Sequence, residues 1–146
     1  MDLLIKKIRE NAIIPTRETS GSAGFDISAC INEQIEIKPN EIVKVPIGIA
    51  VKPSDENVVL LVFPRSGLAT NYGITLANSV GVIDTDYRGE IIVPLINHGE
   101  KSFTIEPQMR IAQIVIMPVI IPKVIETNML DNTERGKKGF GSTGLY

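Results

Sequence analysis

The chain has 146 residues, of which 43% are hydrophobic and 22% charged, and its formal net charge is −2. This length suits one domain with a substantial core, and the charge disfavours a broadly basic surface for nucleic acid. The single Cys30 and the single His98 exclude a disulfide framework and any zinc site that needs several such residues from one chain.

Membrane and export signals are not visible in the sequence. The longest apolar run, 58–63, has six residues, which is far too short to span a membrane. The first ten residues carry five charged side chains and lack the apolar centre of a signal peptide. We therefore expect a cytoplasmic protein without a nucleic-acid or membrane partner.

The composition favours strands, because Ile and Val alone number 35 and β-branched side chains pack well on pleated surfaces. The alternation of apolar residues over 43–51 predicts one strand with a buried face. Nine prolines disfavour long helices, and the only helix we expect is a short one after Ser66. Many short strands predict an all-β sandwich, jelly roll or barrel. In chain order the other predicted strands are 3–8, 35–37, 58–63, 90–96, 102–105 and 110–121.

One compositional break occurs late in the chain. From Asp131 onward the apolar β-branched residues disappear and glycine becomes frequent. We predict a body over 1–130 and a glycine-rich arm over 131–146, with a disordered tail as the alternative. Glycine-rich backbone, hydroxyls and cations suit an anion, and an aromatic residue between two glycines could cover a flat ring. The arm supplies these features in Arg135, Phe140, Ser142 and Thr143.

Three segments of the body place polar residues beside glycine or apolar neighbours. Arg65, Ser66 and Gly67 follow an apolar strand and read either as a plain turn or as a phosphate cradle. Asp84 follows two apolar residues in a predicted hairpin, so it is either a solvated turn residue or a carboxylate in a cleft that holds a water as general base. Asp26 is either an Asx-turn residue or part of the same site.

Taken together, these segments resemble the deoxyuridine triphosphatase (dUTPase) family, whose five ordered motifs are all present. The resemblance covers almost the whole chain, and the length matches the trimeric branch of the family. The motifs read AGFD (23–26), PRSGLA (64–69), NSVGVIDTDYRGE (78–90), PQMRIAQ (107–113) and RGKKGFGSTG (135–144).

The resemblance implies a distorted jelly-roll, or β-clip-like, single domain that forms a homotrimer with active sites between subunits. It implies hydrolysis of dUTP to dUMP and pyrophosphate with Mg²⁺, which keeps uracil out of DNA and supplies dUMP for thymidylate synthesis. The C-terminal arm of one subunit would close a site elsewhere in the trimer. Ordering the arm costs entropy, which phosphate contacts could offset.

The resemblance also implies roles for individual residues. Asp84 would activate the water that attacks the α-phosphorus, Tyr87 would support the deoxyribose, and Asp26 would orient the metal through bound waters. The uracil edge would be read by Asn78 and by the backbone of Gly81, Val82 and Ile83, with one backbone contact from Ile92. The phosphates would be held by Arg65, Ser66, Gly67 and Gln113. From the arm, Phe140 would stack on uracil and Arg135 would reach the γ-phosphate, with Gly141, Ser142 and Thr143 beside it.

Two alternative functions fit the same fold. A dCTP deaminase would need an acid–base group at the base rather than at the α-phosphorus. A regulatory paralogue would bind nucleotide without turnover and would be expected to have at least one broken motif. The intact motifs and the hairpin around Tyr87 favour the triphosphatase.

Overall fold

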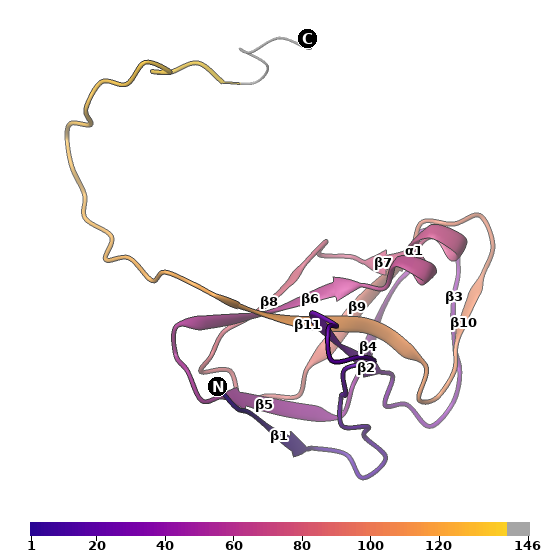
Figure 1. Cartoon of the computed structure of the whole chain (residues 1–146). Helices are drawn as coiled ribbons and strands as arrows, with labels where there is room; N and C mark the ends of the chain where they lie inside the picture. Colours follow the sequence, from indigo (N-terminus) through magenta and orange to yellow (C-terminus); the bar gives the residue numbers. More distant parts are fainter. Residues whose placement is uncertain (140–146) are drawn as a thin grey trace.

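The computed structural model describes residues 1–139, and it confirms the predicted all-β class with a single short helix (Figure 1). The helix, α1 (Ser66–Tyr72), begins where the sequence predicted it and ends at Gly73, whose φ of 72° is the left-handed conformation that glycine tolerates best. The strands in chain order are β1 (Leu3–Lys7), β2 (Gly24–Ser28), β3 (Ile35–Ile37), β4 (Ile42–Pro46), β5 (Ile49–Pro53), β6 (Val58–Pro64), β7 (Ile74–Leu76), β8 (Gly81–Ile83), β9 (Ile92–Asn97), β10 (Phe103–Ile105) and β11 (Arg110–Pro118).

The strands form four antiparallel sheets around one core. The largest sheet has the order β2-β11-β6-β8, a second has the order β4-β9-β7, and two pairs, β1-β5 and β10-β3, complete the body. Strands of each sheet contribute fully buried side chains to one hydrophobic cluster, among them Leu60, Leu95, Ile49 and Ile105. Each sheet therefore turns one face toward a shared interior, as a sandwich-like architecture requires.

The alternation over 43–51 does not form one strand, which corrects the sequence prediction. The chain instead makes β4 and β5, which belong to different sheets, and the break falls at Gly48. Gly48 has a φ of +74°, and a Cβ at this position would lie 2.6 Å from the Cys30 Sγ atom. Ile47 and Ile49 are both buried on either side of the break, so periodicity alone could not reveal it.

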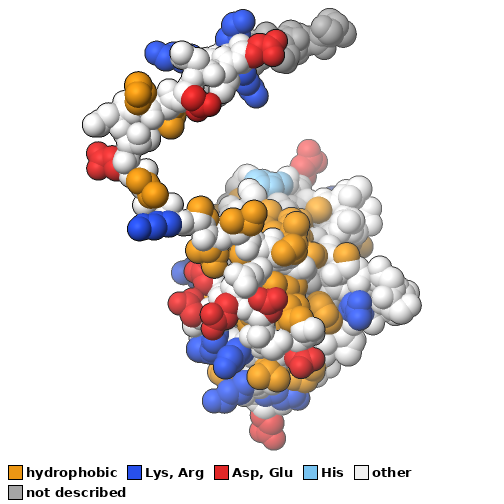
Figure 2. All heavy atoms as spheres, turned by 60° about the vertical axis from the view of Figure 1, so that its left-hand side comes forward, with side chains coloured by type: hydrophobic (Ala, Val, Ile, Leu, Met, Phe, Trp, Pro, Cys, Tyr) orange, Lys and Arg blue, Asp and Glu red, His pale blue; other side chains and the backbone are white. Residues whose placement is uncertain are grey.

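The sheet β2-β11-β6-β8 also has an outer face, which is apolar over β6, β8 and the end of β11. In β6 the buried positions alternate with half-buried ones, and the register places Leu61 between Val115 of β11 and Val82 of β8. Val59 pairs with Met117 on the same face, and Val82 and Met117 are 65% and 45% exposed. Figure 2 shows hydrophobic side chains gathered on one face of the body beside the point where the C-terminal segment leaves it.

The last predicted strand is shorter than expected. Strand β11 ends at Pro118, which has no N–H to continue a ladder, and the amide of Val119 makes one further bond, to the Asn57 carbonyl at 2.9 Å. From 119 to 139 the chain has no helix or strand and is exposed (Figure 1). Within 1–139, no helix has the length and apolarity that a membrane span requires.

Candidate functional site

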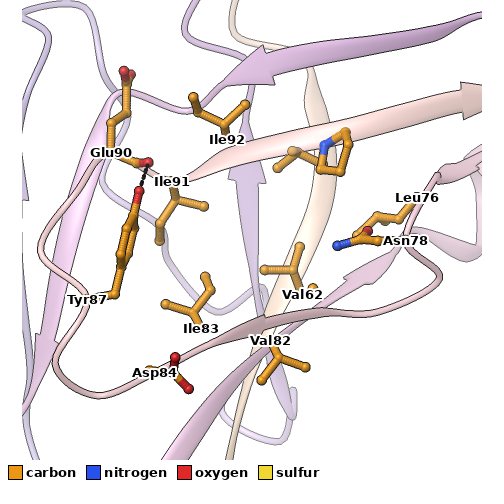
Figure 3. A pocket seen from close by; sticks show the side chains of 13 residues that line it. Val62, Leu76, Asn78, Val82, Ile83, Asp84, Tyr87, Glu90, Ile91 and Ile92 are labelled. Atoms are coloured by element: carbon orange, nitrogen blue, oxygen red, sulfur yellow. Dashed lines mark hydrogen bonds between the residues drawn. The ribbon is translucent and has the colours of Figure 1, made fainter.

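One pocket of about 270 Å³ brings together the residues of the body, outside the C-terminal arm, that were predicted to bind the base and the sugar. Its walls come from β6, from the turn after β7, from β8 and from the start of β9, with apolar side chains such as Val62 and Ile91 between them. Figure 3 shows Asp84 and Tyr87 at one end of the pocket and Asn78 at the other. The predicted residues that line it are Asn78, Gly81, Val82, Ile83, Asp84, Tyr87 and Ile92.

The turn between β7 and β8 fixes the position of Asn78. Ser79 has a φ of 63°, a left-handed conformation that costs a non-glycine residue about 1 kcal/mol. The Ser79 amide donates to the Leu76 carbonyl at 3.1 Å, and the Val80 amide donates to the Asn78 carbonyl at 2.7 Å. The reversal brings β8 back beside β6, so that Gly81 pairs with Val62. A Cβ atom at position 81 would lie only 3.1 Å from the Val62 Cβ atom.

The segment between β8 and β9 is held by hydrogen bonds from Tyr87 at both ends. The Tyr87 amide donates to the Asp84 carbonyl at 3.2 Å, and the Tyr87 hydroxyl donates to the Glu90 carbonyl at 3.0 Å (Figure 3). A Cβ at Gly89 would overlap the Tyr87 hydroxyl. Glycine at 89 therefore lets the tyrosine ring lie across this segment and present one face to the pocket.

Asp84 is available for chemistry. Its residue is exposed, and its carboxylate makes no hydrogen bond or ion pair with any of the described residues. Alternation along β8 turns Ile83 inward and Val82 outward, and Figure 3 shows Asp84 on the same side of the ribbon as Val82. The carboxylate therefore lies at the mouth of the pocket, toward the apolar outer face of the large sheet.

A second pocket, of about 460 Å³, brings together the residues predicted to hold phosphates and metal. The first pocket and this one share no residue. The second lies where β6 ends and α1 begins, and no side-chain hydrogen bond from the described residues caps the start of α1. Its predicted residues are Asp26, Arg65, Ser66, Gly67 and Gln113.

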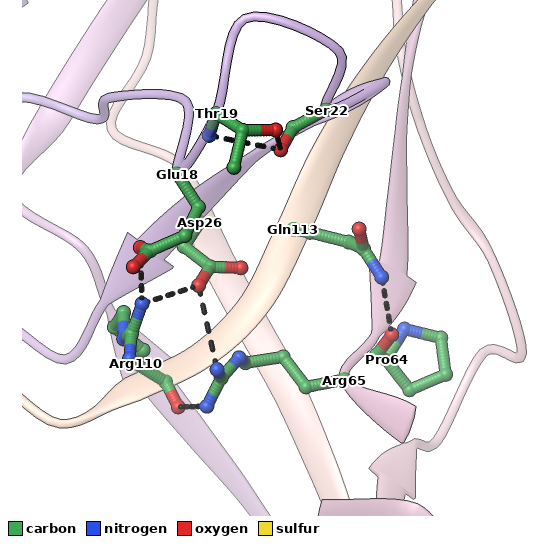
Figure 4. Close-up of polar contacts among 8 residues, drawn as sticks. All are labelled: Glu18, Thr19, Ser22, Asp26, Pro64, Arg65, Arg110 and Gln113. Carbon is green, nitrogen blue, oxygen red and sulfur yellow. Dashed lines mark hydrogen bonds and ion pairs between the residues drawn. The ribbon is translucent and has the colours of Figure 1, made fainter. Parts of the chain in front are cut away.

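Ion pairs organise the second pocket (Figure 4). The Asp26 Oδ2 atom lies 3.0 Å from Arg110 Nη1 and 3.4 Å from Arg65 Nη2. Arg110 also pairs with Glu18 at 2.9 Å, so two guanidinium groups share two carboxylates. Since both arginines are part-exposed, these pairs orient side chains more than they stabilise the fold.

Gln113 and Gly24 fit each other in the same region. Gln113 pairs with Asp26 across β11 and β2, and its amide nitrogen donates to the Pro64 carbonyl at 3.0 Å. A Cβ at Gly24 would lie 2.7 Å from the Gln113 Oε1 atom. The glycine of the first motif thus leaves room for the glutamine of the fourth motif next to the phosphate-side pocket.

The donor set of the second pocket fits Mg²⁺ only as a metal shared with a ligand. The described residues contain no cluster of three His, Cys, Asp or Glu side chains that could hold a metal ion alone. Asp26 is the single carboxylate in this pocket. Mg²⁺ commonly keeps several waters and binds through one or two carboxylates together with substrate phosphates. The single carboxylate of Asp26 is enough for a site of this kind.

Within one chain Asp84 and Arg65 lie near opposite ends of β6. The register pairs Ile83 with Leu60, so Asp84 continues toward Val59, whereas Arg65 follows the other end of the strand. Arg65 lies six positions after Val59, which corresponds to about 20 Å along a strand. A triphosphate is much shorter than this distance.

Comparisons with known proteins show the family of the chain. The sequence profile of the dUTPase family matches residues 10–144. The deoxyuridine 5′-triphosphate nucleotidohydrolase of Desulfitobacterium hafniense is 48% identical over 132 residues, which cover 90% of this chain and 87% of the relative.

The chain belongs to the dUTPase family.

Solved dUTPase structures share the fold. The dUTPase of Staphylococcus bacteriophage 80alpha, solved with dUpNHpp, superposes with a TM-score of 0.89 at 28% identity and covers 99% of both chains. A mutant dUTPase from phage phi11 of S. aureus, in which a structural Mg(II) ion is coordinated, superposes with a TM-score of 0.80 at 22% identity, over 90% of this chain and 100% of that one. The expected jelly-roll fold is thereby confirmed.

Of the fifth dUTPase motif, the structure describes only residues 135–139, and none of these lines either pocket. Arg135 lies on the exposed segment, where its Nε atom donates to the Lys138 carbonyl at 3.2 Å, and Figure 1 shows that segment extending away from the body. The predictions for Phe140, Gly141, Ser142 and Thr143 lie outside the described residues.

Sequence reasoning gave no role to several residues that the structure places at these pockets. Glu90 lines the first pocket, and Arg110 and Glu18 complete the ion pairs of Asp26. Arg110 lies within the fourth dUTPase motif, so a search for charge partners among the motif residues could have found it. Glu18 lies outside every motif, and no local signal marks it.

Proposed function

We propose that the chain, as a member of the dUTPase family, hydrolyses dUTP with water to dUMP and pyrophosphate. Asp84 takes a proton from the attacking water, whose oxygen forms a bond to the α-phosphorus as the bond to the pyrophosphate oxygen breaks. A positioned general base of this kind contributes about 10²–10⁴-fold to a rate. The observation that carries the proposal is the Asp84 carboxylate, which pairs with none of residues 1–139 and lies at the mouth of a pocket that also contains Tyr87 and Asn78.

Base and sugar selection fit the first pocket. Uracil enters between the Asn78 amide and the backbone of Gly81, Val82 and Ile83, with Ile92 at the return strand. A slot built from backbone groups rejects cytosine because polar groups would remain unpaired, and it rejects thymine because the methyl group would clash. The Tyr87 ring, held by the Glu90 carbonyl, lies under deoxyribose and leaves no room for a 2′-hydroxyl.

Phosphate binding fits the second pocket. Arg65 offers a bidentate fork, Ser66 a hydroxyl, and Gln113 a side-chain amide. A Cβ atom built at Gly67 would have no other atom within 4 Å, so the space beside this part of the backbone is open. Asp26 orients Mg²⁺ through water, and the bound metal neutralises charge on the phosphates. In phosphoryl transfer, such positioning and charge neutralisation supply most of the catalysis.

A homotrimer with sites between subunits reconciles the separation of the two pockets. About 20 Å of strand separates Asp84 from Arg65 in one chain, so one dUTP must take its base side from one subunit and its phosphate side from another. The apolar outer face of the β2-β11-β6-β8 sheet, with Val82 and Met117 exposed on it, supplies a surface for such association.

The C-terminal arm completes the site in this proposal. Phe140 stacks on uracil, Arg135 neutralises the γ-phosphate, and Gly141, Ser142 and Thr143 donate hydrogen bonds beside it. The exposed segment 119–139 provides the length to reach another subunit. A cytoplasmic location remains a prediction from the sequence.

A substrate panel of dUTP, UTP, dCTP and dTTP, with and without Mg²⁺, tests the function. We expect pyrophosphate release from dUTP, with Mg²⁺ required for full activity and little release from the other three nucleotides. Ammonia release from dCTP would identify a deaminase instead. Binding of dUTP without any product would identify a regulatory paralogue.

A further inference from the structure

The segment that carries Tyr87 is attached to two distant parts of the chain through one carboxylate. Glu90 accepts two hydrogen bonds from Arg9, from Nε at 2.6 Å and from Nη2 at 3.0 Å. It also accepts one from the Gly48 amide at 3.1 Å. The Glu90 side chain is only 16% exposed, so this carboxylate relies on these three donors rather than on water.

Gly48 closes the arrangement into a ring. Its carbonyl accepts the amides of Ile8 and Arg9 at 2.7 and 3.2 Å, while its own amide donates to Glu90. Gly48 itself has little freedom to move, since its left-handed backbone packs against Cys30 and Ala12. Arg9, Gly48 and Glu90, which we call the Arg9 clasp, therefore fix one another across three separate segments.

The clasp acts on the pocket through the backbone of Glu90. Figure 3 shows the Glu90 carboxylate pointing away from the Tyr87 ring, while its carbonyl faces the Tyr87 hydroxyl. The next residue, Ile91, is anchored by amide and carbonyl bonds to Ile49 and Ile47 at 2.9 and 3.1 Å. The clasp thus holds the side chain of Glu90, and the backbone carbonyl of Glu90 fixes the position of the Tyr87 ring.

Resting on the proposed function, we propose that Arg9 is a positioning residue for sugar selection, because it holds Glu90 and Glu90 holds Tyr87. Arg9 touches neither pocket. Its planar fork satisfies both carboxylate oxygens at once, which the single ammonium group of lysine cannot do in the same geometry. Without the Arg9 guanidinium, the largely buried Glu90 carboxylate keeps only the Gly48 amide as a donor. Because Glu90 is then held less firmly, the segment that carries Tyr87 loosens.

The test compares Arg9→Leu with Lys6→Leu, which removes the same charge from an exposed position of β1 that has no ion pair among the described residues. We expect Arg9→Leu to lower the dUTP-to-UTP ratio of kcat/KM about tenfold, mainly through KM, because small displacements of a binding group are costly. Arg9→Lys should recover part of the ratio. Hydrogen exchange over residues 84–90 should rise in Arg9→Leu and stay unchanged in Lys6→Leu.

The outcomes separate the two proposals. If wild-type protein releases no pyrophosphate from dUTP, the proposed function fails, and the exchange measurement alone then decides the clasp. If wild-type protein is active but Arg9→Leu keeps either the wild-type ratio or the wild-type exchange rate, the positioning role is overturned. Glu90→Gln combined with Arg9→Leu should be no worse than the more impaired single variant, since both break one contact. Arg9→Lys answers the same questions if Arg9→Leu does not fold.

Discussion

The two pockets beside β6 are held in place by different physical means. The pocket around Asp84 has apolar walls, and backbone hydrogen bonds fix its shape. The pocket around Asp26 is polar, and its geometry depends on pairs between two arginines and two carboxylates. An apolar slot suits the recognition of a flat base by shape, whereas charged side chains at the surface suit phosphates. The contrast implies that substitutions in the first pocket alter selectivity and turnover, and that substitutions in the second alter phosphate affinity.

The largest expected effect comes from the first pocket. Asp84→Asn should reduce pyrophosphate release from dUTP by about 10³-fold or more, since the amide cannot accept the proton from water. Binding of a non-hydrolysable dUTP analogue, measured by calorimetry, should stay within a few-fold of wild type. Asp86→Asn, which changes a neighbouring exposed carboxylate outside that pocket, is the control. Retained turnover in Asp84→Asn would remove this residue from the mechanism.

Deletion of residues 135–146 should affect the phosphate side next most strongly. We expect activity to fall about 10²-fold or more, because the charge and hydrogen bonds that the arm is proposed to bring to the phosphates are lost. Gel filtration and circular dichroism should show an intact assembled body. Full activity of the shortened protein would contradict the proposed role of the arm.

Mixing two inactive variants tests whether the pockets combine between chains. Asp84→Asn and Arg65→Leu should each be nearly inactive alone. Co-expressed trimers of both chains should recover up to about a quarter of wild-type activity, since in random trimers about one site in four would take both intact residues from different subunits. No recovery would mean that both residues must come from the same chain.

A smaller effect on activity is expected from Gly24, where strand β2 meets the second pocket. Gly24→Ala brings a Cβ to 2.7 Å from Gln113 Oε1, so the glutamine must move and KM for dUTP should rise a few-fold. Gly21→Ala adds the same methyl group at a position with no atom within 4 Å and serves as the control. Equal KM values for the two variants would show that the orientation of Gln113 does not matter.

The smallest expected effect concerns acid stability. The hydrogen bond from Arg9 lowers the pKa of Glu90 below its ordinary value of 4.5. A carboxylate with a lowered pKa stabilises the fold above that ordinary value, and the contribution is lost as pH falls through the lower folded-state value. The melting temperature of wild type should therefore exceed that of Arg9→Leu at pH 7, and the difference should shrink below about pH 4.5. A constant difference from pH 7 to pH 3 would contradict this assignment.

Much of the body could be predicted because its signals are local. The apolar runs of β6 and β9 and the turn before α1 each depend on a few adjacent residues. The three-residue strands β7 and β8 were not predicted, whereas the equally short β3 and β10 were, because a turn with proline follows each of the latter. The break at Gly48 was missed because the apolar alternation continues through it, and only the tertiary contact with Cys30 shows why glycine is needed there.

The candidate site likewise combines features that have a local sequence signal with features that depend on tertiary contacts. Motif residues predicted from the resemblance fall into two pockets, yet their separation along β6 depends on strand register, which the sequence does not display. The clasp between Arg9 and Glu90 joins residues 81 positions apart, and neither residue has a local pattern that names its partner.

The apolar outer face of the β2-β11-β6-β8 sheet has a consequence for how the protein behaves when diluted. If the folded state includes this face covered by other copies, dissociation exposes apolar surface and folding becomes linked to association. The melting temperature then depends on protein concentration and falls as the sample is diluted, in contrast to that of a monomer with a polar exterior.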